Sequence, residues 1–88
     1  MRIAVIEDEA PIREGMAKIL ARINPDYEVV GTAKDGREGY DLIKKECPDL
    51  VILDIQMPGM NGLQMLEKLR REKIDCRVLV LTAYSDFN

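Results

Sequence analysis

The chain has 88 residues and a formal net charge of −3 at neutral pH. This length suits one domain, which would bury about 60 to 65% of its unfolded surface. With 47% hydrophobic and 33% charged residues, the composition is that of an ordinary globular protein and argues against disorder. A weakly acidic balance lacks the basic patch that neutralises phosphates, so we expect no direct nucleic-acid binding by this segment.

The first apolar run is too short to be a targeting segment. It covers residues 3–6 and is interrupted by Glu7 and Asp8, before a signal-peptide core or a membrane span could form. We therefore expect a cytoplasmic protein that does not bind a membrane.

The two cysteines do not form a recognisable motif. Cys47 and Cys76 lie far apart, and the chain contains no histidine and no CxxC pair. This argues against a zinc site or a redox motif. We expect reduced thiols that are buried or half-buried.

The first half of the chain predicts a strand, a helix and a second strand. The first strand covers residues 2–6, and Pro11 follows where a first-turn proline is tolerated. Residues 24–26, Asn-Pro-Asp, end the helix, and the second strand covers residues 27–33. Between them, one apolar helix face is formed by Ile12, Met16, Ile19, Leu20 and Ile23.

The second half repeats this alternation. Asp35-Gly36 marks a turn, a helix is predicted over residues 37–46, and Pro48 stops it. Residues 50–53 are apolar on both faces, as in a central strand that is covered on both sides. The last predicted helix is defined by Leu63, Leu66 and Leu69, and Asn61 is the candidate N-cap of this helix. The last strand covers residues 78–81. Alternating strands and helices predict an α/β fold with a parallel sheet.

Three acidic residues follow two of the predicted strands. Glu7 and Asp8 come directly after the first strand, and Asp54 comes directly after residues 50–53. Because the carboxyl ends of parallel strands open into one crevice, we expect the three carboxylates to share a site. Like charges held together away from water are costly unless a cation joins them. A hard divalent cation such as Mg²⁺ is the natural ligand.

At these positions the chain resembles the receiver domains of two-component response regulators. The resemblance lies in Glu7-Asp8, in Asp54 within residues 53–62, and in residues 81–83, and it covers the whole chain. It implies a flavodoxin-like doubly wound parallel sheet of strand order 2-1-3-4-5. It also implies that a sensor histidine kinase transfers a phosphoryl group to Asp54. Glu7 and Asp8 would hold Mg²⁺ together with Asp54 and the backbone carbonyl of Gln56.

The resemblance assigns further roles around Asp54. Thr82 resembles the hydroxyl residue that bonds a phosphoryl oxygen and draws the following loop inward, and a short hydroxyl donor suits that role. Backbone N–H groups of Gln56 and Ala83 would bind the phosphoryl group. Gln56 and Tyr84 occupy positions that tune the lifetime of the phosphoryl group. Exposed positions of the first helix, such as Arg13 and Lys18, are candidates for kinase docking.

One departure from the family pattern concerns the end of the sequence. Receiver domains continue to a fifth strand followed by a phosphate-binding lysine, so we expect residues 1–88 to be a C-terminally incomplete receiver domain. Its phosphorylation should be slow, or its switch disabled. An output domain, such as a DNA-binding effector, would lie beyond residue 88. Strand 78–81 would then be an apolar edge, so we expect self-association through this strand or through an exchanged segment.

Two other functions remain as alternatives. A phosphatase or phosphotransferase of the haloacid-dehalogenase type also uses an aspartyl phosphate. Such enzymes carry a DxD pattern at the nucleophile, whereas here position 56 is Gln. That enzyme would lack its second carboxylate as a general acid. A degenerate or truncated receiver would instead act as an interaction module independent of phosphorylation.

Overall fold

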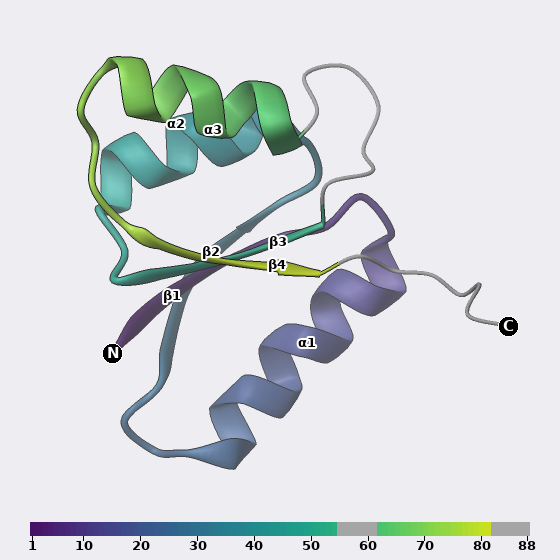
Figure 1. Cartoon of the computed structure of the whole chain (residues 1–88). Helices are drawn as coiled ribbons and strands as arrows, with labels where there is room; N and C mark the ends of the chain where they lie inside the picture. The colour runs from purple at the N-terminus through teal and green to yellow at the C-terminus, as the bar shows by residue number, and fades with distance from the viewer. Residues whose placement is uncertain (55–61, 82–88) are drawn as a thin grey trace, which may run out of the picture.

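The computed structural model describes residues 1–54 and 62–81. In these ranges, strands and helices alternate along the chain (Figure 1). The elements are β1 (Arg2–Ile6), α1 (Ala10–Ile23), β2 (Glu28–Ala33), α2 (Gly36–Glu46), β3 (Leu50–Asp54), α3 (Gly62–Arg71) and β4 (Arg77–Leu81). Each predicted element is present, and the predicted strand and helix limits differ from these by a residue or a few. Asn61 lies outside the described residues.

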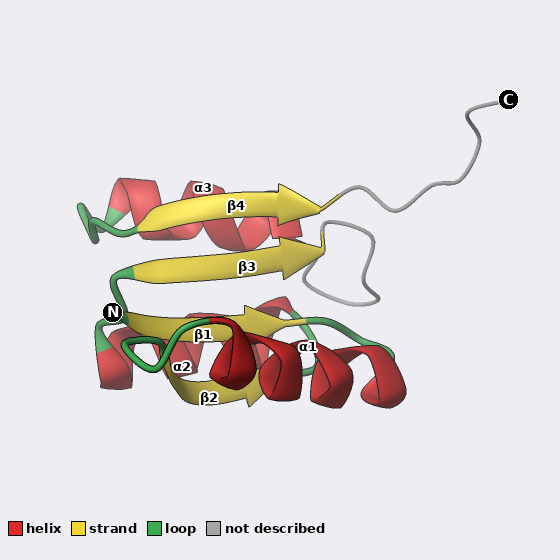
Figure 2. Cartoon of the chain, turned by 90° about the horizontal axis from the view of Figure 1, so that it is seen from below, coloured by secondary structure: helices red, strands yellow, loops and turns green. Residues whose placement is uncertain are grey.

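The strands form one parallel sheet of order β2-β1-β3-β4. This is the predicted flavodoxin-like order. β1 and β3 are neighbours in the middle of the sheet, with Val5 opposite Ile52 and Ile6 opposite Leu53. Viewed from below, β2 and β4 are the outer strands of the described part (Figure 2).

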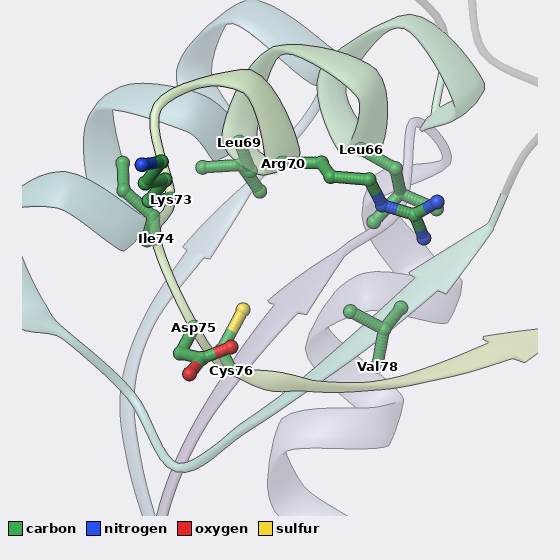
Figure 3. A pocket seen from close by; sticks show the side chains of 8 residues that line it. All are labelled: Leu66, Leu69, Arg70, Lys73, Ile74, Asp75, Cys76 and Val78. Carbon is green, nitrogen blue, oxygen red and sulfur yellow. The ribbon is translucent and has the colours of Figure 1, made fainter.

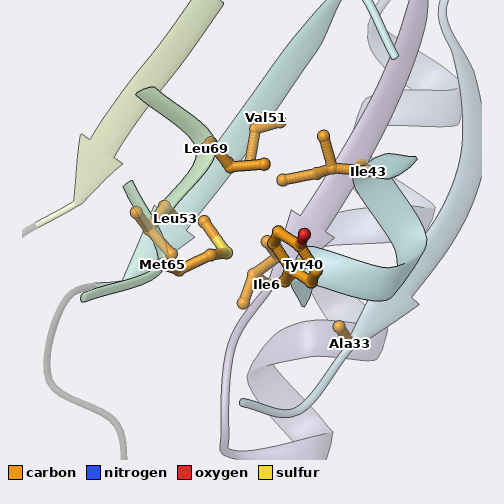
Figure 4. Packing of buried hydrophobic residues seen from close by; sticks show 9 residues of the cluster. Ile6, Ala33, Tyr40, Ile43, Val51, Leu53, Met65 and Leu69 are labelled. Atoms are coloured by element: carbon orange, nitrogen blue, oxygen red, sulfur yellow. The ribbon is translucent and has the colours of Figure 1, made fainter. Parts of the chain in front are cut away.

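Helices cover both faces of the sheet, α2 and α3 on one side and α1 on the other (Figure 1). This explains why β1 and β3 are apolar at almost every position. The larger core lies beneath α2 and α3, where side chains of the sheet meet those of both helices (Figure 4). Its buried members are Ala4, Ile6, Ala33, Tyr40, Ile43, Val51, Leu53, Met65 and Leu69.

The core beneath α1 is smaller. Ile3, Val5 and Ile52 are buried there, and Met16 and Leu20 of α1 pack against them. The predicted apolar face of α1 is wider than this contact. Its remaining members are strongly exposed, at 46% for Ile12, 57% for Ile19 and 63% for Ile23.

The two ends of α2 show how local sequence sets its limits. Asp35 is the N-cap, and its Oδ1 accepts a hydrogen bond of 2.8 Å from the N–H of Glu38. At the other end, Cys47 adopts a left-handed conformation with φ of 47°, and its N–H donates to the Ile43 carbonyl. Cys47 is also exposed, so the prediction that both thiols are buried or half-buried is wrong for Cys47. Cys76 is half-buried as expected.

Candidate functional site

The carboxyl ends of β1 and β3 bring three carboxylates together. Glu7 and Asp8 directly follow β1, and Asp54 is the last residue of β3. Because Ile6 lies opposite Leu53, the two strands end at the same level of the sheet. One carboxylate oxygen from each of the three residues lies within 4.8 Å of the others. The juxtaposition expected from the sequence is thus present.

Backbone contacts hold the loop that carries two of these acids. The N–H of Glu7 donates to the carbonyl of Ala33 in β2 at 3.0 Å, which ties the loop to the sheet. The N–H of Glu9 donates to Oε2 of Glu7 at 3.1 Å. Nη1 of Arg13 donates to the carbonyl of Glu7 at 2.9 Å and to the carbonyl of Asp8 at 3.5 Å. The loop is thereby attached to both β2 and α1.

The site is electrostatically unfavourable for a third negative charge. Glu7 is only 6% exposed and Asp54 only 8%. Burial raises the pKa of Glu7 to about 7, and a hydrogen bond with Asp8 and the negative charges of Asp54 and Asp8 act in the same direction. The N–H of Glu9 opposes this rise only in part. The cluster therefore favours either a bound proton or a cation.

The donor set fits a hard divalent cation. Mg²⁺ prefers oxygen ligands, is bound through a small number of carboxylates, and keeps several water molecules. Glu7, Asp8 and Asp54 supply carboxylate oxygens close enough together to share one ion. The fourth predicted ligand, the carbonyl of Gln56, lies outside the described residues, as do Thr82, Ala83 and Tyr84. Leu81, the residue before Thr82, pairs with Asp54 across the sheet.

Arg13 is a site residue whose contacts the sequence analysis missed. The sequence suggested an exposed docking position, but Arg13 is half-buried and turns toward the loop after β1. Lys18 is exposed as expected. The sequence does show that Arg13 lies near the start of α1, five residues after Asp8. Helical periodicity alone does not show that its side chain points back toward the loop after β1.

A cavity between α3 and β4 lies away from the carboxylates. It has a volume of about 390 Å³ and contains none of the three acids (Figure 3). Its lining combines apolar and charged side chains, namely Leu66, Leu69, Arg70, Lys73, Ile74, Asp75, Cys76 and Val78. Residues of this composition do not offer the converging acids of the β1–β3 edge, so the cavity is not the candidate functional site.

The fold and the acidic cluster together define a flavodoxin-like α/β domain with a candidate cation site at the carboxyl edge of its sheet. A family model described as the response regulator receiver domain matches residues 3–88. The chain therefore belongs to the response regulator receiver domain family. Among the helices that the structure describes, none has the length and apolar character needed to cross a membrane.

Relatives of known sequence are response regulators. The chain is 40% identical over 80 residues to the nitrate/nitrite response regulator protein NarL of Escherichia coli, which covers 91% of this chain and 37% of NarL. It is 38% identical over 86 residues to the transcriptional regulatory protein HptR of Staphylococcus aureus, covering 98% of this chain and 33% of HptR. The chain thus spans about a third of the length of these relatives.

Solved structures agree with this assignment. The response regulator domain of CheB from Thermotoga maritima superposes with a TM-score of 0.87 at 31% identity, over 100% of this chain and 64% of that one. A DNA-binding response regulator of the LuxR family from Staphylococcus aureus gives a TM-score of 0.87 at 29% identity, over 98% of this chain and 71% of that one.

Proposed function

We propose that this chain is a phosphorylation-controlled switch in which Asp54 accepts a phosphoryl group from a sensor histidine kinase. The observation that carries the proposal is the convergence of Glu7, Asp8 and Asp54 within 4.8 Å at the carboxyl edge of the sheet. Membership of the receiver family supports the same assignment. The partner kinase, an output domain in the rest of the protein and a cytoplasmic location belong to this proposal.

In the proposed reaction, a carboxylate oxygen of Asp54 attacks phosphorus and forms a new P–O bond. The P–N bond to the kinase imidazole breaks, and the imidazole nitrogen leaves with the electron pair. The product is an acyl phosphate on Asp54. Glu7, Asp8, Asp54 and the Gln56 carbonyl would hold Mg²⁺, which, when bound, offsets the negative charge of the carboxylates and of the phosphoryl oxygens.

The proposal extends to the residues around the phosphoryl group. Backbone N–H groups of Gln56 and Ala83 would donate to its oxygens, and the Thr82 hydroxyl would bond one of them after transfer. The added charge would then bias the loop that follows Thr82 and remodel an output surface. The chain would act as a regulator with limited self-catalysed transfer and dephosphorylation rather than as a metabolic enzyme.

We also propose that the 88-residue chain self-associates through β4. β4 is an outer strand of the described sheet (Figure 2), and its residues Leu79 and Val80 are 51% and 40% exposed. An apolar outer strand is a template for pairing with another chain. Sedimentation velocity should show dimers at high concentration, and Leu79→Lys should reduce them. A strictly monomeric wild-type chain would contradict this part of the proposal.

The phosphoryl-acceptor role is tested by intact-mass spectrometry. The protein is incubated with Mg²⁺ and a small acyl phosphate donor, with Asp54→Asn as the control. One added phosphoryl group on the wild type, absent from Asp54→Asn, is the expected result. Modification of the control would place the acceptor elsewhere. Rapid donor turnover without accumulation would favour a phosphatase, and no modification even in the full-length protein would favour an inert interaction module.

A further inference from the structure

Arg13 makes the contact that joins α1 to the acidic loop. Its Nη1 donates to the carbonyl of Glu7 at 2.9 Å and lies 3.5 Å from the carbonyl of Asp8. Both carbonyls belong to residues whose side chains enter the carboxylate cluster. One guanidinium thus holds the backbone of two of the three acids, although its own side chain is not a member of the cluster.

The loop needs such a restraint because its side chains repel one another. Oxygens of the three carboxylates lie within 4.8 Å of one another, and like charges at this distance favour any movement that separates them. The N-cap position of α1, Glu9, makes no capping hydrogen bond through its side chain. Among the residues that the structure describes, the loop is anchored by Glu7 N–H to the Ala33 carbonyl, by Glu9 N–H to Oε2 of Glu7 and by the backbone N–H of Arg13 to the Glu9 carbonyl. The Arg13 guanidinium adds the bonds to the Glu7 and Asp8 carbonyls.

We propose that Arg13 is a positioning residue for the acidic cluster, because its guanidinium holds the Glu7 and Asp8 carbonyls so that their carboxylates converge with Asp54 before a cation binds. The inference rests on the proposed function. It deepens that function by adding a residue that acts through others. A planar guanidinium suits this task, because its several N–H donors have fixed directions.

The charge of Arg13 and its hydrogen bonds act on cation binding in opposite directions. A positive charge beside the cluster repels Mg²⁺, so loss of the charge alone would tighten Mg²⁺ binding. Loss of the hydrogen bonds frees the loop and weakens binding, because the carboxylates must then be brought together at the moment of binding. The sign of the change in affinity therefore distinguishes positioning from a simple field effect.

The test is an NMR titration of the ¹⁵N-labelled chain with Mg²⁺, followed at the backbone amide of Glu9. Arg13→Met should raise the dissociation constant for Mg²⁺ about tenfold, as the loss of residues that orient metal ligands commonly does. Arg13→Lys, which keeps the charge and one donor group, should restore part of the affinity. Lys18→Met removes the same charge from an exposed position of the same helix and should leave the constant within about twofold of the wild type.

Hydrogen exchange of the Glu9 amide in the metal-free protein provides a second readout. Its bond to Glu7 Oε2 should open more often in Arg13→Met, so exchange should be faster than in the wild type. Unchanged exchange, or Mg²⁺ affinity that is equal or higher in Arg13→Met at a temperature where the variant is folded, would overturn the inference. Absence of Mg²⁺ binding by the wild type would instead overturn the proposed function, and the exchange rates would still decide whether Arg13 restrains the loop.

Discussion

The two ends of the β-strands carry charged residues in opposite arrangements. At the amino end, the Arg2 guanidinium donates to Oε1 of Glu46 at 2.8 Å. The backbone N–H of Arg2 donates to Oδ2 of Asp49 at 2.8 Å. Opposite charges and complementary hydrogen-bonding groups meet there, and they join β1 to the end of α2 and to the start of β3.

At the carboxyl end, like charges meet instead. Glu7, Asp8 and Asp54 lie within 4.8 Å of one another, and the pKa of Glu7 is raised to about 7. Such an arrangement costs stability in the metal-free protein. The difference teaches that charge at the amino end forms complementary contacts within the fold, whereas charge at the carboxyl end does not, as the proposed cation site requires. Substitutions at the two ends should therefore have different consequences.

The largest expected effect is a dependence of metal-free stability on pH that comes from Glu7. The folded state keeps a proton on Glu7 up to about pH 7, whereas the unfolded chain releases it near 4.5. The free energy of unfolding should therefore fall by about 3 kcal/mol as pH rises through this window. Urea unfolding in chelator at several pH values measures this, and Glu7→Gln should remove that component. An equal pH dependence in both proteins would refute the assignment to Glu7.

The next effect concerns Mg²⁺ binding. Asp8→Asn removes a charged ligand from the cluster and should weaken Mg²⁺ binding about 100-fold, or about 2.8 kcal/mol. Isothermal titration calorimetry at pH 8 measures the change. Binding should also be tighter at pH 8 than at pH 6, because a proton on Glu7 competes with the cation below its pKa of about 7. Equal dissociation constants for the variant and the wild type would remove Asp8 from the site.

A smaller effect is expected at the amino end. Asp49→Ala leaves the N–H of Arg2 without its side-chain acceptor and should lower the free energy of unfolding by about 1 kcal/mol. Its Mg²⁺ affinity should equal that of the wild type. Asp49→Asn keeps an oxygen acceptor and should lose less stability. If Asp49→Ala weakened Mg²⁺ binding as strongly as Asp8→Asn, the two ends would not be functionally separate.

The smallest effect is expected for the ion pair between Arg2 and Glu46. Its side chains are 41% and 27% exposed, so water and salt screen the attraction. Glu46→Gln should cost about 0.5 kcal/mol in urea unfolding at low salt, and the difference from the wild type should disappear in about 1 M sodium chloride. A loss that persists in high salt would show that this pair contributes more than a screened surface interaction.

Much of the fold could be predicted from the sequence because its signals are local. The apolar runs at β1 and β3 identify central strands, and the rule that parallel strands share their carboxyl ends places Glu7 and Asp8 beside Asp54. These inferences need only periodicity and strand direction. They do not require knowledge of how the helices are oriented.

What the sequence could not show depends on those orientations. Arg13 was expected to face solvent, yet it reaches the loop because α1 begins directly after that loop. The sequence also did not predict how closely α2 approaches β1. A Cβ on Gly39 would lie 2.5 Å from Cδ1 of Ile6, so a larger residue at position 39 would require the Ile6 side chain to move. Both features depend on the distances between helices and strands. The spacing of apolar residues along the sequence does not encode these distances.

The central claim is that the carboxyl ends of β1 and β3 form one cation site around the phosphoryl acceptor. The most direct measurement is a crystal structure of the chain soaked with Mn²⁺, which binds the same oxygen ligands as Mg²⁺ and gives an anomalous signal. We expect a single strong anomalous peak within about 2.5 Å of carboxylate oxygens from both Asp8 and Asp54. Carboxylates of Asp8 and Asp54 that point apart, with no peak between them, would contradict the account.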